Sequence, residues 1–327
     1  MQITFLGASH GVPEANRRCS CTLIETNGRY YFIDMGVNAI DALRTRGIDV
    51  EDVKGIFITH MHGDHTNGLI SFVDLISWYF KTADPEICLP NLEGVEAIRA
   101  WLKANHCEMR DLRFKKVTDG TIFDDGYLKV TAIPTQHCPD SHAFFVEAEG
   151  KAVLFTGDLK HPNVDFPKIA KEKPTEFVIC EAAHFPATDY APVLAACPTK
   201  QVLVNHYAPW NIPNVMQLAE TLVALLKQLV DRQSGKLVEA FFHIRHNVGD
   251  REIGVGRALA FLEHRVDDIH VENLVSVHAH DRSRLGRARA VLPQNGREAL
   301  GRKHRIHSML LHGHTVGQRK RERTAAA

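Results

Sequence analysis

The hydrophobic pattern divides the chain up to about residue 210 into short apolar runs and amphipathic stretches. Runs such as "CTLIET" and "RYYFID" are bounded by Gly, Pro, Asn or Asp, as strands commonly are. The runs predict strands at residues 3–7, 21–26, 29–34, 55–60, 86–90, 127–134, 142–149, 151–157, 176–182 and 201–206. Apolar residues that recur at three- and four-residue intervals predict helices at 37–46, 66–81, 92–106 and 213–231.

The early strands follow one another almost directly, and an Asn27-Gly28 pair separates the second from the third. Asn-Gly is a typical two-residue hairpin turn, which favours antiparallel neighbours over a purely parallel sheet. The later strands alternate with helices. We therefore expect an α/β protein with mixed sheets and helices outside them.

The balance of charged residues and the frequency of histidine change near residue 235. Residues 1–234 carry 22 Lys and Arg against 29 Asp and Glu, whereas residues 235–327 carry 17 against 10 and hold ten of the 20 histidines. The change predicts a catalytic domain over 1–234 and a basic, His- and Arg-rich C-terminal appendage over 235–327. Residues 251–274 could contain an amphipathic helix, and the remainder has little apolar periodicity.

Composition excludes several classes of protein. No apolar run of about 18 residues is present, so we expect no membrane span, and the start "MQITFLG" lacks the features of a secretory signal. The seven cysteines are an odd number without a disulfide-scaffold pattern, which indicates reduced thiols. We expect a cytoplasmic protein.

The strongest chemical signal is "FITHMHGDHTNG", where His60, His62, Asp64 and His65 lie within six residues at the end of an apolar run. Imidazoles at 60 and 62 can converge on one cation, and the next two side chains can reach a second. Without a ligand, several polar rings that face one another would be left with unsatisfied nitrogens. We interpret the motif as part of a metal site on a loop after a strand.

Other strand ends supply further ligand candidates. His137 follows one predicted strand and His142 begins the next, while Asp158 and His206 each follow or end an apolar run. From the residues alone, either histidine of "HCPDSH" could complete the set. The pairs "HAH" at 278–280 and "HGH" at 312–314 follow no convincing strand, and we attribute them to the high histidine content of the tail.

With these motifs, residues 1–215 resemble the metallo-β-lactamase fold superfamily, in the phosphodiesterase branch of ribonuclease Z and the cyclic phosphodiesterase of phosphonate breakdown. "FLGASHGVPEANRRCSCTLIE" and "YYFIDMG" carry the same resemblance. It implies a four-layer αββα sandwich with the site at an edge between two sheets. It assigns one metal to His60, His62 and His137, the other to Asp64, His65 and His206, and Asp158 as a bridge; it favours His137 over His142.

The ligand set contains nitrogen and carboxylate donors without cysteine, which suits two Zn²⁺ ions and also accepts Mn²⁺ or Fe²⁺. A pair of cations can activate water and neutralise charge that develops on a phosphoryl oxygen. The resemblance implies that Asp64 orients or deprotonates that water. In "FVICEAAHFPATD", Glu181 and His184 match the spacing of the cyclic phosphodiesterase, so we expect His184 to contact phosphate or donate a proton, with a structural cap as the alternative.

These features predict a metal-dependent phosphodiesterase that acts on a small phosphodiester. A lactonase or thioesterase on the same metal pair is one alternative, and a tRNA 3′-processing endonuclease is another. RNA binding has less support, since residues 1–234 are net acidic and no insertion before residue 210 resembles the long, basic Gly- and Pro-rich arm of ribonuclease Z. The sequence leaves a homodimer open.

Overall fold

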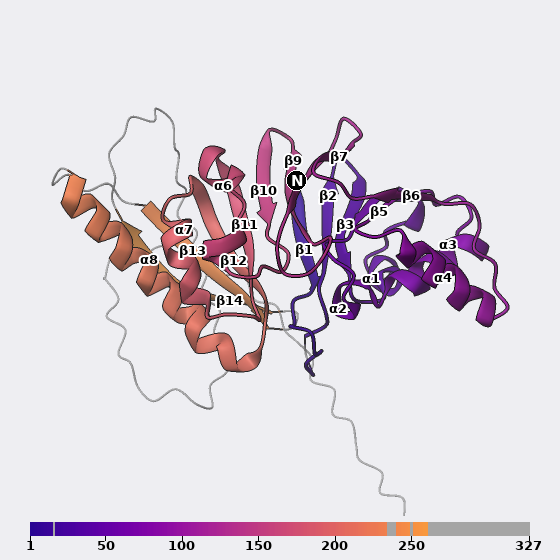
Figure 1. Ribbon diagram of the computed structural model, residues 1–327, viewed down its shortest axis with the longest axis horizontal. Coiled ribbons are helices and arrows are strands. Elements are labelled where there is room, and N and C mark those ends of the chain that lie inside the picture. The colour runs from indigo at the N-terminus through magenta and orange to yellow at the C-terminus, as the bar shows by residue number, and fades with distance from the viewer. Residues whose placement is uncertain (16, 234–239, 249–250, 261–327) are drawn as a thin grey trace, which may run out of the picture. The chain divides into compact units, whose positions relative to one another are not determined.

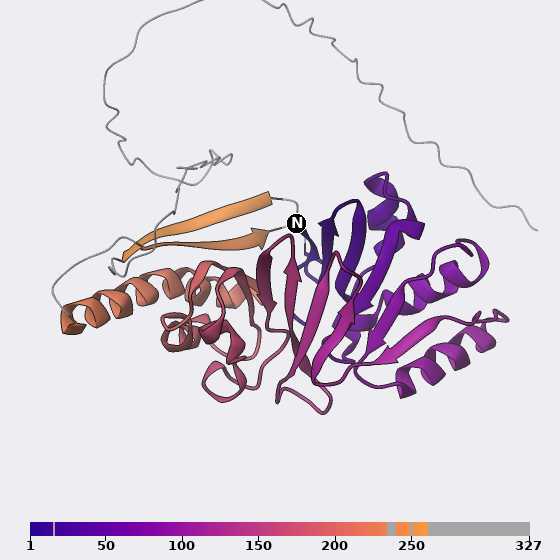
Figure 2. The ribbon, with the colours of Figure 1, turned by 90° about the horizontal axis from the view of Figure 1, so that it is seen from above.

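The computed structural model describes residues 1–15, 17–233, 240–248 and 251–260, all of which belong to one compact unit, Met1–Leu274. Two β-sheets lie face to face, and helices cover the outer face of each (Figures 1 and 2). This is the predicted four-layer αββα sandwich. None of the helices in the described ranges is long and apolar enough to cross a membrane.

The first sheet has six strands in sequence order. They are β1 (Gln2–Gly7), β2 (Cys21–Thr26), β3 (Arg29–Met35), β4 (Val53–Phe57), β5 (Glu86–Leu89) and β6 (Arg113–Lys116). The first three pair antiparallel and the last three join in parallel. Asn27 and Gly28 both have positive φ, as the tight turn between β2 and β3 requires.

The second sheet runs from β7 at one edge to β14 at the other. Its strands are β7 (Gly120–Asp124), β8 (Lys129–Pro134), β9 (His142–Ala148), β10 (Lys151–Phe155), β11 (Thr175–Ala182), β12 (Thr199–Tyr207), β13 (Ala240–Val248) and β14 (Arg251–Ala260). β10 to β13 pair in parallel, and the pairs that flank them are antiparallel. The carboxyl ends of the central strands therefore share one edge.

Three apolar clusters fill the spaces between layers. One lies between the first sheet and helices α1 (Ala39–Thr45), α3 (Leu69–Trp78) and α4 (Glu93–Ala104). Another packs the second sheet against α7 (Ala191–Leu194) and the start of α8 (Ile212–Gln233). The third joins the two sheets, with aromatic rings from both. The remaining helices are short: α2 (Gly63–Thr66), α5 (Pro162–Asp165), α6 (Ile169–Glu172), η1 (Val50–Asp52), η2 (Ala187–Tyr190) and η3 (Pro209–Asn211).

The apolar pattern predicted the long elements and missed those with little apolar content. β6 has the sequence RFKK with largely exposed side chains, and β7 is half exposed, so neither gives a strong hydrophobic signal. The helix considered for 251–274 is wrong over Arg251–Ala260, which forms β14; the rest lies outside the described residues. β13 and β14 extend the second sheet beyond residue 235, and the boundary proposed there stays a prediction.

Candidate metal centre

The His60–His65 motif spans the loop after β4 and the start of α2. Strand β4 ends at Phe57, His62 has extended backbone, and the short helix that contains Asp64 and His65 begins at Gly63. His60 and His65 are buried, whereas His62 is exposed. A rigid scaffold therefore holds the motif with one side open to solvent.

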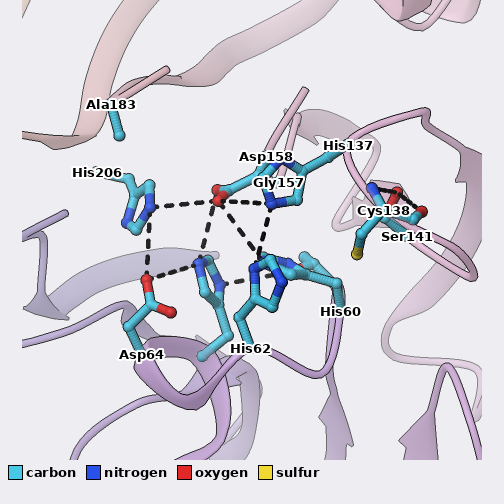
Figure 3. Close-up of polar contacts among 12 residues, drawn as sticks. His60, His62, Asp64, His137, Cys138, Ser141, Gly157, Asp158, Ala183 and His206 are labelled. Carbon is cyan, nitrogen blue, oxygen red and sulfur yellow. Dashed lines mark hydrogen bonds and ion pairs between the residues drawn. The ribbon is translucent and has the colours of Figure 1, made fainter. Parts of the chain in front are cut away.

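The first group of candidate ligands contains His60, His62 and His137, whose ligand atoms lie within 4.8 Å of one another. His60 Nε2 is 3.0 Å from His62 Nδ1, which is 3.2 Å from His137 Nε2 (Figure 3). His137 comes from the loop after β8, so the two sheets contribute jointly. Burial, together with the neighbouring His65, lowers the pKa of His60 to about 2, which keeps it neutral as a metal ligand must be.

The second group contains Asp64, His65 and His206. His206 lies near the end of β12 with a left-handed backbone (φ 46°), and its Nε2 is 3.6 Å from Asp64 Oδ2. His65 Nε2 is 3.4 Å from the same oxygen. Burial opposes the ionised form of Asp64, but the neighbouring imidazoles of His65 and His206 lower its pKa to about 2.

The buried Asp158 carboxylate lies between the two groups (Figure 3). Its oxygens are 3.3 Å from His206, 3.6 Å from His65 and 3.7 Å from both His60 and His137. Burial alone would raise the pKa of Asp158, yet His206 and His65 hold it well below its usual range. One carboxylate therefore faces histidines of both groups, which is the arrangement expected for a bridging ligand.

Asp34, at the end of β3, is a functional candidate that we did not identify from the sequence. Its buried carboxylate accepts hydrogen bonds from His65 Nδ1 at 2.7 Å, from Thr59 N at 2.8 Å and from Thr59 Oγ1 at 2.9 Å. The bond to Nδ1 leaves Nε2 of His65 free to face the cluster. Acidic partners of this kind orient metal-binding histidines in many proteins. The signal in the sequence that could have identified Asp34 is an acidic residue at the end of an apolar run, in the strand that pairs with the one leading to the motif.

The donor set fits divalent metal ions. His65 Nε2 and Asp158 Oδ1 are buried and have no hydrogen-bond partner, an arrangement that costs free energy unless a ligand meets them. Burial disfavours charge on His65, but the carboxylates of Asp34 and Asp158 raise its pKa well above the usual value. The two carboxylates thus favour positive charge at the position of His65, and the nitrogen and oxygen donors of the cluster are those that zinc prefers.

Glu181, near the end of β11, and His184, two residues after that strand, lie beside the cluster. The Glu181 carboxylate is buried and accepts from the backbone N–H groups of Leu159 and Ala183 and from His184 Nδ1 at 3.0 Å. This hydrogen bond outweighs burial and raises the pKa of His184. The His184 side chain is 38% exposed and its Nδ1 is 3.9 Å from Asp158 Oδ2, so it borders both the cluster and solvent. Glu181 itself is placed to orient His184 rather than to touch a substrate.

The remaining histidine candidates lie apart from the ligand groups. His142 hydrogen-bonds through Nδ1 to the carbonyl oxygen of Asp140, and its Nε2 is 3.5 Å from Asp119. His161 precedes α5, where its Nδ1 accepts from the N–H of Asn163, and its Nε2 is 3.2 Å from Asp189. All seven cysteines are free thiols, as expected. The histidine pairs at 278–280 and 312–314 lie outside the described residues.

Comparison with known sequences identifies the family. Residues 1–192 match the family described as "Anti-Pycsar protein Apyc1". The chain belongs to this family. Curated relatives include a ribonuclease Z from Shouchella clausii, 32% identical over 157 residues (46% of this chain and 49% of that one), and one from Pseudomonas putida, 33% identical over 175 residues (53% and 52%). The chain spans about half the length of these relatives.

Solved structures show the same fold for this Apyc1-family chain. The short form of human tRNase Z superposes with a TM-score of 0.53 at 20% identity, over 64% of this chain and 94% of that one. The metallo-β-lactamase fold protein YhfI from Bacillus subtilis gives 0.55 at 17% identity, over 67% and 92%. These neighbours show the predicted metallo-β-lactamase fold, and the curated ribonuclease Z relatives support the predicted branch within it. The curated relatives are named ribonucleases, in agreement with the expectation of a metallo-hydrolase.

Proposed function

We propose that this protein is a metal-dependent phosphodiesterase that holds two divalent ions, Zn²⁺ first among them. The observation that carries the proposal is the pairing of two ligand groups around one carboxylate. His60, His62 and His137 would hold one ion, and Asp64, His65 and His206 the other, with Asp158 facing both. Metal pairs of this kind supply an activated water and neutralise charge on a phosphoryl group.

The side chains around this centre have two kinds of role. Some orient the metal-binding residues, and others accept or donate protons. Asp34 fixes His65 by the hydrogen bond to Nδ1. One carboxylate oxygen of Asp64 faces the histidines, which leaves the second oxygen for another contact. The low pKa of Asp64 keeps the carboxylate ionised, so it can accept a hydrogen bond from water. We therefore assign Asp64 the orientation of the attacking water as well as a ligand role.

His184 is proposed as the group that protonates the leaving oxygen. Glu181 holds its ring through Nδ1 and favours the protonated form, which leaves Nε2–H as the donor. His184 also forms a possible ligand group with His137 and Asp158. The proton-donor role has better support, since the imidazole is hydrogen-bonded to a buried carboxylate and 38% exposed.

A small phosphodiester is the substrate that the charge distribution favours. Residues 1–234 carry seven more acidic than basic side chains, since 29 Asp and Glu stand against 22 Lys and Arg. Such a surface offers little attraction to a polyanion. The names of the relatives favour a second candidate, the processing of RNA, which the basic segment after residue 235 would have to support. A homodimer stays a prediction.

Metal analysis combined with a substrate panel tests the proposal on the full chain. We expect two ions per chain, turnover of bis(p-nitrophenyl) phosphate, and little turnover of lactone, thioester or precursor tRNA. Asp158→Ala should abolish metal retention and activity together. His142→Ala is the control. This histidine follows His137 closely in the sequence but lies outside both ligand groups. A chain that retains no metal, or that hydrolyses lactones in preference to diesters, would refute the proposal.

A further inference from the structure

His206 has one buried ring nitrogen, Nδ1, without a hydrogen-bond partner among the described residues. Its other nitrogen, Nε2, faces Asp64 at 3.6 Å and Asp158 at 3.3 Å (Figure 3), so Nδ1 lies on the far side of the ring from the cluster. A neutral imidazole that binds a metal through one nitrogen carries its proton on the other. Leaving that N–H unsatisfied in the interior is unfavourable, so Nδ1 of His206 needs an acceptor.

The other two buried histidines among the candidate ligands have such a partner. His60 Nδ1 is 3.1 Å from Thr59 Oγ1, and His65 Nδ1 is 2.7 Å from Asp34 Oδ2. Partners of this kind hold the rings of metal-binding histidines in their orientation. The group that orients the His206 ring must therefore come from the space next to its Nδ1.

A cavity of about 30 Å³ lies next to His206, towards the interior of the sandwich. Its wall includes Asp34, which bonds the far nitrogen of His65, and apolar side chains of the cluster that joins the two sheets. Within the described part of the chain, neither Asp64 nor the three ligands of the first group line it, so the cavity lies behind the ligands rather than at the position of either ion. One water molecule requires roughly 10–15 Å³ and two to four polar partners, and this cavity is large enough for it.

A β-bulge turns Asn205 and His206 towards this same cavity. The pairing of β11 with β12 shifts register here, so that both residues oppose Glu181. The extra residue and the left-handed backbone of His206 interrupt the alternation of side chains, and both side chains line the cavity. Asn205 Oδ1 is buried and, like His206 Nδ1, has no partner among the described residues. A buried donor and a buried acceptor, both unsatisfied, thus belong to residues that line one water-sized space.

We propose that this cavity binds an ordered water molecule, which accepts a hydrogen bond from His206 Nδ1 and donates one to Asn205 Oδ1. Thr156 also lines the cavity, and its hydroxyl donates to the carbonyl oxygen of Gly157, which leaves a lone pair for the second proton of the water. Asn205 is then a positioning residue that fixes the ring of His206 through this water. The inference rests on the proposed metal-binding role of His206 and adds the groups that orient it.

High-resolution crystallography of the full chain, prepared with and without zinc, tests the water site directly. We expect a water molecule within hydrogen-bond distance of both His206 Nδ1 and Asn205 Oδ1 in each preparation. A direct contact between these two side chains, or the two atoms apart with no water between them, would overturn the inference. If the chain binds no zinc but the water occupies its position, the water site is supported and the proposed metal-binding role of His206 is wrong.

Asn205→Leu tests the positioning role, because it removes the acceptor and keeps a side chain of similar size. In stepwise competition with a chelator, we expect it to weaken binding of the ion held by Asp64, His65 and His206 about 10- to 100-fold, as loss of an orienting partner does, and to leave the other ion at parental affinity. Asn205→Asp keeps an acceptor oxygen and should bind that ion at least as tightly as the parent.

Thr175→Val is the matched control. Thr175 Oγ1 is likewise buried without a partner in the described part of the chain, but Thr175 begins β11, at the end of the strand far from Glu181. The control should bind both ions as the parent does. Parental affinity for both ions in Asn205→Leu, or an equal loss of both, would overturn the positioning role.

Discussion

The charge of Asp34 is the feature whose removal tests the metal centre most directly. Asp34→Asn keeps the size of the side chain, and Asn tolerates the left-handed backbone found there (φ 58°). The wild-type carboxylate accepts three hydrogen bonds, two from Thr59 and one from His65. The amide can accept through one oxygen only, and its NH₂ group would face a donor.

The expected magnitude follows from these contacts. At least one buried donor loses its partner in Asp34→Asn, which costs about 1–3 kcal/mol of unfolding free energy. His65 also loses the carboxylate that holds its Nδ1–H, so the ring is no longer fixed with Nε2 towards Asp64 and Asp158. Loss of such an orienting partner commonly lowers metal affinity about 10- to 100-fold.

Competition with a chelator gives the metal affinity, and urea denaturation of the metal-free protein gives the stability. Asp125→Asn is the matched control: this carboxylate accepts from Tyr31 and from the backbone of its own turn, and none of the candidate ligands is among its partners. The control should lose stability but bind metal as the parent does. If Asp34→Asn binds metal with parental affinity while losing similar stability, Asp34 is structural and the orienting role is wrong.

Two further predictions concern proton transfer and acid stability. His184→Gln should lower kcat about 10²- to 10⁴-fold for diesters with an alcohol leaving group but much less for p-nitrophenyl esters, which need no proton; an equal loss for both would exclude the proton-donor role. Tyr31→Phe removes the 2.6 Å hydrogen bond to Asp125, which helps to lower the pKa of that carboxyl against the effect of its burial. The variant should lose about 1.5–3 kcal/mol at neutral pH. Because a lowered folded-state pKa contributes its full stability above the unfolded value of about 3.9 and loses it as pH falls towards the folded value, the difference in unfolding free energy should shrink over that range. A pH-independent difference in urea denaturation would contradict this prediction.

The sequence predicted the fold where apolar runs are long and failed where they are absent. β2 spans the predicted residues because every position of "CTLIET" is buried or nearly so. β6 is held by pairing with β5, and its charged side chains point to solvent, so its backbone hydrogen bonds decide its structure. For β14 the error is the opposite one. Polar and apolar residues alternate there as in a strand, but the stretch was interpreted as an amphipathic helix.

The candidate ligands were accessible from the sequence because they lie at or soon after strand ends, and strand ends of a mixed α/β fold meet at one edge. The residues that orient them were not. Asp34 contacts His65 across 31 positions in sequence, and this proximity follows from the pairing of β3 with β4, which no local pattern records. The choice of His137 over His142 shows the same limit: both flank one loop, and only the position of that loop brings the first into the cluster.

Each candidate ion would join the two halves of the sandwich. His60 and His62 follow a strand of the first sheet, while His137 follows one of the second; Asp64 and His65 are likewise completed by His206 from the other sheet. Apolar contacts join the sheets through their interior, but the edge between them contains buried imidazole nitrogens and a carboxylate oxygen without hydrogen-bond partners among the described residues. Metal binding would convert this unfavourable edge into a cross-link between sheets. The side chains that would hold the water-activating ions would therefore also determine how firmly the edge between the sheets is closed.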